Sequence, residues 1–386
     1  MIILSLVLAL GGGPDHDRKG FRYWKDPGAF KEYIAKGDTG RFLGLWSTFV
    51  TATFAYLGTE LVGVTVGEAQ NPRKTIPRAI KLTFYRIVFF YVLSVFLLGM
   101  LVPYNSKELI FANKKSSSAA ASPFVVAIVL SGIPHLPGIL NACILLFVFS
   151  ASNSGALPSP FLHLYPPLTE KNLDLYIASR TIYGLAREGK APAFLAYTDK
   201  RGVPVYALGV SSLFSLLAFM NVSSDSKVVF GYFVNLVTIF GILTWISILV
   251  THIYFVRARR AQGVVDEQLA YTAPLGVKGS YGALASCILI AVFKNFSVFT
   301  YSSSYGKFDY KNFVTGYIGI PLYLILIFGH KYRYKGTAIP ASRVDLFTDK
   351  DKIDREEEEF LKAKALKTMK GKKGGWFYKT FVAWLF

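Results

Sequence analysis

The chain has 386 residues, of which 52% are hydrophobic, 16% aromatic and 17% charged, and its mean hydropathy is +0.38. This composition excludes an ordinary soluble domain and is typical of a membrane protein that crosses the bilayer several times. The formal net charge of +19 does not indicate a nucleic-acid-binding protein, because the basic residues lie in short segments between apolar runs.

Apolar stretches predict the order of the membrane spans. Residues 2–10 are too few to cross a bilayer and lack the features of a signal peptide, so we interpret them as the end of a helix. The predicted spans are 42–66, 82–102, 123–153 with a continuation at 174–186, 203–221, 228–256, 281–299 and 313–328. Residues 1–330 are thus predicted to form a partial transmembrane domain. Residues 331–386 are predicted to form a polar tail with a solvated acidic helix at 351–359.

Basic residues in the connections predict the orientation of the spans. They follow the span 42–66, the segment 174–186 and the span 228–256, whereas the connections after the spans 203–221 and 281–299 hold few. Because short cytoplasmic loops are enriched in Lys and Arg, these connections and the C-terminal tail are predicted to be cytoplasmic. The connection 11–41 must then be external, although it holds several Lys and Arg residues, and the sequence offers no reason for this conflict.

A carboxylate lies near the middle of the first long span. Glu60 is costly in the hydrocarbon region, and an acid at such a depth is a candidate functional residue. Gly58, Gly63 and the neighbouring Thr59 favour a helix that opens its backbone hydrogen bonds. Transporters build polar sites from such broken helices near the bilayer midplane. The sequence therefore predicts a broken helix with a functional site at this point.

Four blocks of sequence carry a resemblance to a known family. They are 12–30, the run Gly-Thr-Glu-Leu-Val-Gly at 58–63 with Asn-Pro-Arg at 71–73, the motif at 150–154 joined to 174–186, and the segment 189–204. In these blocks the chain resembles the fungal (yeast-type) amino acid permeases of the amino acid–polyamine–organocation superfamily. The resemblance runs from the first residues into the tail.

The resemblance implies an all-α polytopic membrane protein. The chain would be the C-terminal part of a twelve-helix inverted-repeat transporter fold, comprising the end of helix five and helices six to twelve, with a broken helix six. Helices one to four and most of helix five would precede it. In that family helix one supplies half of the substrate site, including backbone amides for the substrate carboxylate.

The resemblance also implies which residues meet the substrate. The carbonyl groups of the broken part of helix six, 54–59, would face the substrate ammonium, and one aromatic side chain would close over the bound amino acid. The predicted substrate-binding residues are Phe54, Ala55, Tyr56, Leu57, Gly58, Thr59, Ser150, Ser152, Asn153 and Thr244. Ordinary packing is the alternative for the aromatic residues, and a hydrogen bond back to the same helix is the alternative for the serines.

Two acids are candidates for carrying a coupled proton. Glu60 either exchanges a proton during transport or is a structural carboxylate whose partner lies in the preceding half of the fold. Asp174 is the second candidate, and an acid that faces cytoplasmic water at a helix end is its alternative.

No cofactor is predicted from the sequence. The His residues are scattered, and Cys143 and Cys287 lie in apolar spans without a neighbouring Cys/His cluster of ligand spacing. A Gly-rich phosphate loop ending in Lys-Ser/Thr is also lacking, which disfavours transport driven by ATP. A proton gradient is the expected energy source, and no enzyme activity is expected.

The predicted function is proton-coupled import of amino acids across the plasma membrane. Its partners would be an amino acid substrate and the lipid bilayer, with no nucleic acid. A non-transporting amino acid sensor of the same fold is one alternative, and a non-functional gene remnant is another. The amino acids transported and the oligomeric state do not follow from the sequence.

Residues 155–173 interrupt the third of these blocks. This insert contains Pro158, Pro160, Pro166 and Pro167. Prolines break helices, and the insert would place irregular backbone at membrane depth. Without it the block reads Ser-Asn-Ser-Asp-Leu-Tyr-Ile-Ala-Ser-Arg. The codons possible at its two ends allow a splice donor and an acceptor, so we hypothesise a retained intron; a true insertion is the alternative.

We therefore expect spliced messenger RNA to lack the codons of residues 155–173 and to regenerate the Asp174 codon at the junction. Sequencing of full-length cDNA from the locus measures this directly. Spliced reads that keep these codons would contradict the intron hypothesis and establish a true insertion.

Overall fold

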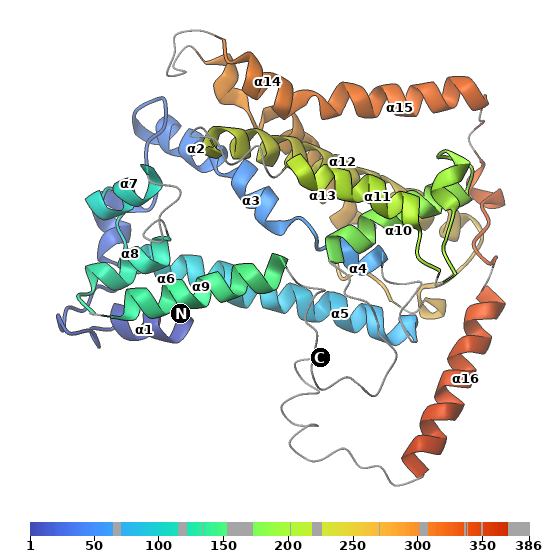
Figure 1. Cartoon of the computed structure of the whole chain (residues 1–386), viewed down its shortest axis with the longest axis horizontal. Helices are drawn as coiled ribbons and strands as arrows, with labels where there is room; N and C mark the ends of the chain where they lie inside the picture. The colour runs from blue at the N-terminus through green and yellow to red at the C-terminus, as the bar shows by residue number, and fades with distance from the viewer. Residues whose placement is uncertain are drawn as a thin grey trace. The chain divides into compact units, whose positions relative to one another are not determined.

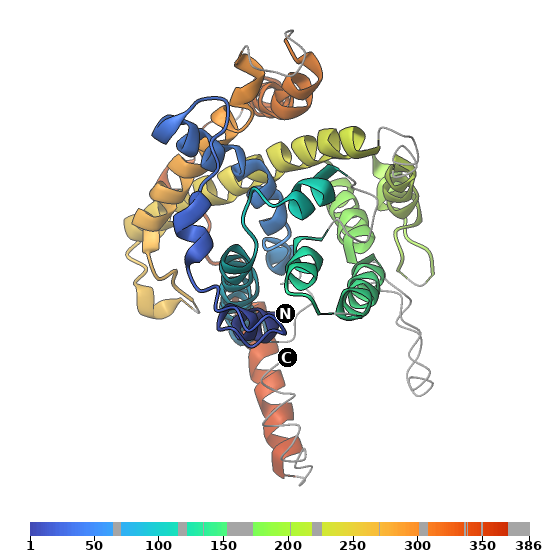
Figure 2. The same cartoon turned by 90° about the vertical axis from the view of Figure 1, so that its left-hand side faces the viewer.

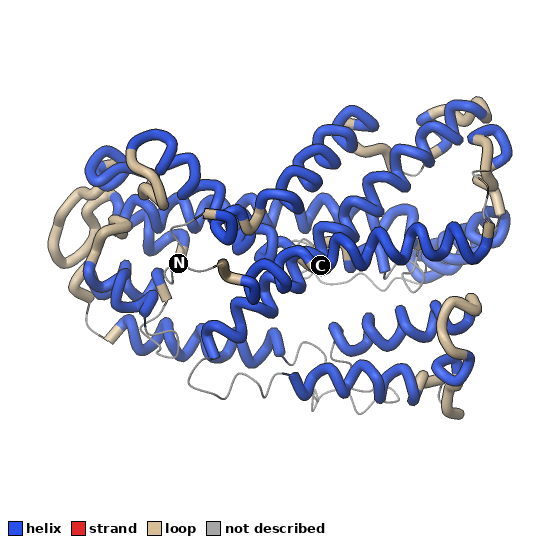
Figure 3. The backbone as a smooth tube through the Cα atoms, turned by 90° about the horizontal axis from the view of Figure 1, so that it is seen from above, coloured by secondary structure: helices blue, strands red, loops and turns tan. Residues whose placement is uncertain are grey.

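The structure, a computed structural model, describes residues 1–64, 71–114, 122–133, 135–152, 173–200, 202–217, 226–269, 271–300, 308–335, 337, 339–348 and 350–369. Within these ranges every regular element is helical, which confirms the predicted all-α class (Figure 3). The predicted insert lies outside the described residues except for Leu173.

The chain packs into two compact units, and the first comprises Met1–Leu57, Thr83–Ile242 and Leu289–Leu322. Its own helices are α1 (Ile2–Ala9), α2 (Gly37–Ser47), α3 (Phe49–Tyr56), α6 (Leu93–Leu101), α7 (Lys107–Lys114), α8 (Pro123–Leu130), α9 (Leu136–Ser152), α10 (Leu173–Arg187), α11 (Val205–Ser215) and α14 (Tyr310–Tyr317) (Figure 1). Apolar residues of α1, α6 and α8, including Leu8, Leu101 and Ala127, form its buried core.

The second unit comprises Gly58–Leu82, Leu243–Ile288 and Tyr323–Phe386. Its own helices are α4 (Leu61–Val64) and α16 (Lys350–Met369). Several longer helices contribute residues to both units, namely α5 (Pro72–Arg86), α12 (Ser226–Ala261), α13 (Gly276–Phe293) and α15 (Gly319–Tyr334).

Four helical stretches of the described residues are long and apolar enough to cross a membrane: Pro72–Leu101, Val228–Ala261, Gly276–Phe299 and Tyr310–Tyr334. A π-helical segment, Ile87–Val92, keeps the first of them continuous from α5 into α6. Each contains at least 24 residues, which exceeds the roughly 20 needed to span the hydrocarbon core. The polytopic membrane class that the sequence predicted is therefore confirmed.

The span predicted at 123–153 is described as far as Ser152, and this part forms two helices. Helix α8 ends at Leu130, and α9 begins at Leu136. Between them Gly132 and His135 have φ values of +66° and +65°, a left-handed conformation that a helix cannot continue through. Hydropathy alone did not reveal this interruption, because the residues on both sides of it are apolar.

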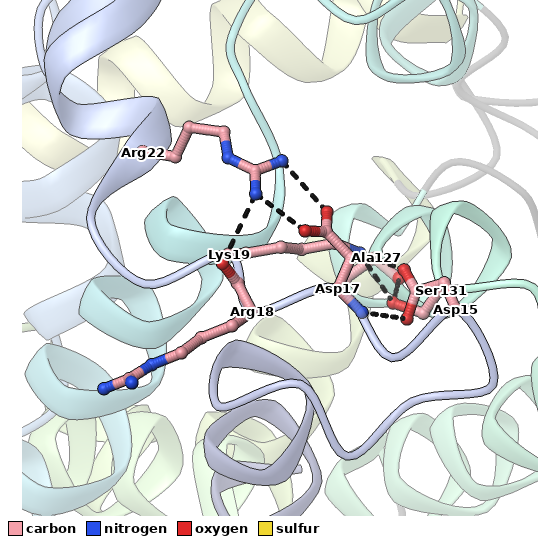
Figure 4. A network of polar contacts seen from close by, with 7 residues as sticks. All are labelled: Asp15, Asp17, Arg18, Lys19, Arg22, Ala127 and Ser131. Atoms are coloured by element: carbon pink, nitrogen blue, oxygen red, sulfur yellow. Dashed lines mark hydrogen bonds and ion pairs between the residues drawn. The ribbon is translucent and has the colours of Figure 1, made fainter.

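Acidic neighbours hold several bases of the connection 11–41 (Figure 4). Arg22 binds Asp17 through two hydrogen bonds of 2.9 and 2.6 Å. The buried Lys19 lies 3.3 Å from the carboxylate of Asp15 and donates to Ser131 Oγ, just after α8, at 3.5 Å. The bases that conflicted with the predicted orientation are thus partly structural, because they fasten the connection to itself and to the end of α8.

The tail helix α16, red in Figure 2, is fastened by ion pairs within the second unit. Arg73, at the start of α5, pairs with Asp354 and lies 3.0 Å from Glu357 Oε2. Before α16, Gln262 Nε2 donates to the carbonyl groups of Ala341 and Val344 at 3.1 and 2.7 Å. The acidic helix expected to be solvated therefore uses part of its acidic face to bind the start of α5.

The Asp17–Arg22 pair predicts a pH-dependent stability. Hydrogen bonds from Arg22 lower the pKa of the Asp17 carboxyl from its ordinary value of 3.8. The stability that the pair contributes is therefore present above pH 3.8 and is lost as the pH falls through the lowered pKa of the folded protein. We expect Asp17→Asn to remove this component from the acid dependence of the thermal unfolding midpoint, measured on protein purified in detergent.

Asp38→Asn is the matched control, because the Asp38 side chain is 97% exposed beside Arg41. We expect it to retain the acid dependence of the parent. An unchanged acid dependence in Asp17→Asn would contradict the prediction.

Candidate functional site

The helix predicted over 42–66 is broken near its middle. Helix α3 ends at Tyr56, and α4 begins at Leu61. Leu57 is extended, with φ −60° and ψ 147°, and Gly58 has a φ of +96°. The predicted break is therefore present, but it covers residues 57–60. Phe54, Ala55 and Tyr56 remain in the regular helix α3.

Two hydrogen bonds explain why the helix stops here. In a continuous helix the Gly58 amide would donate to the carbonyl of Phe54. Instead the Leu57 amide donates to that carbonyl at 3.3 Å, and the Gly58 amide donates to Glu60 Oε2 at 3.1 Å. The Glu60 carboxylate thus takes the place of a helix carbonyl, and glycine allows the left-handed turn that this requires.

Glu60 has a second partner that the sequence did not reveal. The indole Nε1 of Trp245, in α12, donates to Glu60 Oε2 at 3.1 Å. The half-buried carboxylate therefore accepts one N–H from the break and one from a helix far along the chain. The structure thus supplies a side-chain partner for Glu60 within the present chain, and both alternatives for its role stay predictions.

In the first unit, α12 also packs against the end of α3. The ring of Phe54 contacts Phe230 edge to face, with centroids 6.4 Å apart. A Cβ added to Gly241 would lie 2.2 Å from Leu57 Cδ2, so the close approach of Leu57 depends on glycine at that position. The ring of Tyr56 contacts Tyr91, with centroids 5.8 Å apart.

The remaining predicted site residues are placed only by their helices. Ser150 and Ser152 belong to α9 and Asp174 belongs to α10, but their side chains are outside the described part of the structure, as is all of Asn153. Thr244, in α12, and Thr59, in the break, are exposed. Among the predicted substrate and proton residues, the described side-chain contacts bring together Gly58 and Glu60. The other assignments stay predictions.

Trp245 and Gly241 are the site residues that sequence reasoning missed. They are four residues apart and so lie on one face of α12. A tryptophan in an apolar span carries an N–H that needs an acceptor, and this was the available signal. Among the described residues, no group of three or more His, Cys, Asp and Glu could hold a metal ion.

The chain matches the family described as amino acid permease over residues 1–160 and 172–338. The gap in this match, 161–171, falls inside the predicted insert. The dicarboxylic amino acid permease of Saccharomyces cerevisiae is 51% identical over 393 residues, which cover 100% of this chain and 61% of that protein.

Two further relatives are similar over most of the chain. An uncharacterized amino-acid permease of Schizosaccharomyces pombe is 42% identical, over 89% of this chain and 61% of that protein. The proline-specific permease of Emericella nidulans is 37% identical, over 92% of this chain and 61% of that protein. The chain thus spans 61% of the length of each of these relatives. No solved structure matches the chain.

The break predicts that alanine has different effects at Gly58, which lies inside it, and at Gly63, which lies in α4 just after it. Gly58→Ala places a Cβ at a φ of +96° and should lower the free energy of unfolding by about 1–2 kcal/mol. Gly63→Ala is the control, because Gly63 lies in α4 with open space around it and alanine is the better helix former. Thermal unfolding in detergent measures both, and equal midpoints would contradict the assigned conformation of Gly58.

Proposed function

The chain belongs to the amino acid permease family, and on that premise we propose that it imports amino acids across the plasma membrane, coupled to protons. The observation that carries the proposal is the break at residues 57–60 in a chain of this family. Broken helices are the means by which such transporters expose backbone groups to a substrate near the bilayer midplane.

The chemistry at the end of α3 fits one part of the substrate. The last carbonyl groups of a helix lack amide partners and carry the negative end of the helix dipole. An α-ammonium group is complementary to them. The Phe54 carbonyl accepts the Leu57 amide, so in the proposed site the carbonyl groups of Ala55 and Tyr56 meet the ammonium group of the amino acid. The side chain of Phe54 or Tyr56 covers it.

We propose dicarboxylic amino acids, aspartate and glutamate, as the substrate class. The relative named for these substrates is 51% identical, whereas the relative named for proline is 37% identical. Side chains that select a substrate diverge with overall identity, so the more similar relative is the better guide. This substrate class is proposed for the whole transporter, of which the chain spans part.

The proposed energy source is the proton gradient, and no cofactor is proposed. Glu60 and Asp174 are the acids proposed to take part in proton coupling. Ionisable groups at membrane depth are energetically costly, and those that occur there commonly serve transport. The protein would be a multi-pass plasma-membrane protein with its C-terminus in the cytoplasm. That orientation is supported by the basic residues Arg73 and Lys74, which follow Pro72, and by Arg259 and Arg260 at the end of α12.

Uptake in yeast tests the proposal. The chain encoded by the spliced message is expressed in cells that lack acidic amino acid uptake, and entry of labelled glutamate is measured in acidic and neutral medium. We expect uptake above the empty vector, stronger in acidic medium and abolished by a protonophore.

Labelled proline and lysine serve as comparison substrates. Preferential proline or lysine uptake would overturn the substrate class. A protein that reaches the plasma membrane and carries none of these amino acids would contradict transport and favour the non-transporting sensor.

A further inference from the structure

Trp245 lies in the part of α12 that belongs to the second unit. Its ring is half-buried, and its indole N–H would be costly in an apolar span without an acceptor. The acceptor is Glu60 Oε2, at 3.1 Å. A hydrogen bond to a carboxylate is stronger than one between neutral groups, so this contact is a strong constraint on where the Glu60 side chain lies.

The same carboxylate oxygen controls the backbone of the break. Glu60 Oε2 accepts the Gly58 amide at 3.1 Å, and this is the amide that the end of α3 leaves without its helical partner. If the carboxylate turned away, the Gly58 amide would lose this acceptor at membrane depth. The orientation of Glu60 and the conformation of the break are therefore linked through one oxygen atom.

Hydrogen bonds to other helices fasten the part of α12 that follows Trp245. Two residues further along α12, Ser247 Oγ lies 2.8 Å from the hydroxyl of Tyr323 in α15. Five residues beyond that, His252 Nδ1 lies 2.8 Å from Ser280 Oγ in α13. This part of α12 is thus fastened to two other helices of the second unit. A donor carried on a fixed helix can position the group that it binds.

We propose that Trp245 is a positioning residue for the broken helix, whose indole N–H fixes the Glu60 carboxylate and thereby holds the break in one geometry. The contact stands independently of transport, but its consequence for uptake rests on the proposed function. If the carbonyl groups at the break bind the substrate ammonium, their placement depends on Glu60. Trp245 then affects substrate affinity through Glu60.

A double-mutant cycle tests this role. Trp245→Phe keeps an aromatic ring and removes the N–H, Glu60→Ala removes the acceptor, and the double variant combines them. We expect Trp245→Phe to raise KM for glutamate at least about tenfold, the lower end of the effect of one hydrogen bond to a charged group, with Vmax per folded transporter within about twofold. The double variant should be no worse than Glu60→Ala.

Trp46→Phe is the matched control. Its indole Nε1 donates to the carbonyl of Phe293 at 3.0 Å in the first unit, so it loses the same kind of donor away from Glu60. We expect its KM to equal that of the parent. Equal KM values for Trp245→Phe and the parent, or fully additive effects of Trp245→Phe and Glu60→Ala, would overturn the positioning role.

A second measurement separates this inference from the proposed function. The same variants are purified in detergent, and their thermal unfolding midpoints form a second cycle that needs no transport. Non-additive effects of the two substitutions on the midpoint support the Trp245–Glu60 pair even if the parent transports no amino acid. In that case only the transport proposal fails. Additive midpoints would overturn the pairing of Trp245 with Glu60 whatever the uptake result.

Discussion

A break in a membrane-spanning helix leaves backbone amides and carbonyl groups without partners where no water replaces them. In this protein the problem arises at Gly58, and the carboxylate of Glu60 answers it by accepting the Gly58 amide. The charged Glu60 carboxylate and the Gly58 amide, each costly when unpaired at membrane depth, therefore stabilise each other. The candidate site depends on this one contact, because it allows α3 to end while the chain continues into α4.

Helix α12 contributes residues to both units, and within each unit it contacts residues of this break. In the first unit it supplies Gly241, against which Leu57 packs, and in the second it supplies Trp245, which binds Glu60. The small Gly241 and the large Trp245 make contact in opposite ways. Glycine permits close approach of a side chain, whereas tryptophan spans a gap and ends in a hydrogen-bond donor. One long helix thus makes a different kind of contact in each of the two units.

Charged side chains in the connections form local ion pairs, in addition to the effect of Lys and Arg on membrane orientation. Lys19 is buried beside Asp15 and Ser131, and Arg73 binds two acids of α16. Counting bases predicts which side of the membrane a loop occupies, but it does not register whether a base is already paired. The acidic run of the tail likewise resembles a solvated helix in sequence, although Glu357 is only 18% exposed against Arg73.

The sequence by itself determined the membrane class, the family resemblance and the approximate place of the break. Each of these depends on residues that are neighbours in the chain: long apolar runs, short motifs, and a carboxylate beside Gly58. Tertiary structure alone decided that Glu60 binds Trp245, 185 residues away, and that Arg73 binds Glu357, 284 residues away. It also decided that the described part of the predicted span 123–153 is two helices. Local patterns register burial and backbone preference, whereas the choice of a distant partner depends on which helices pack together, and no spacing within the chain specifies that.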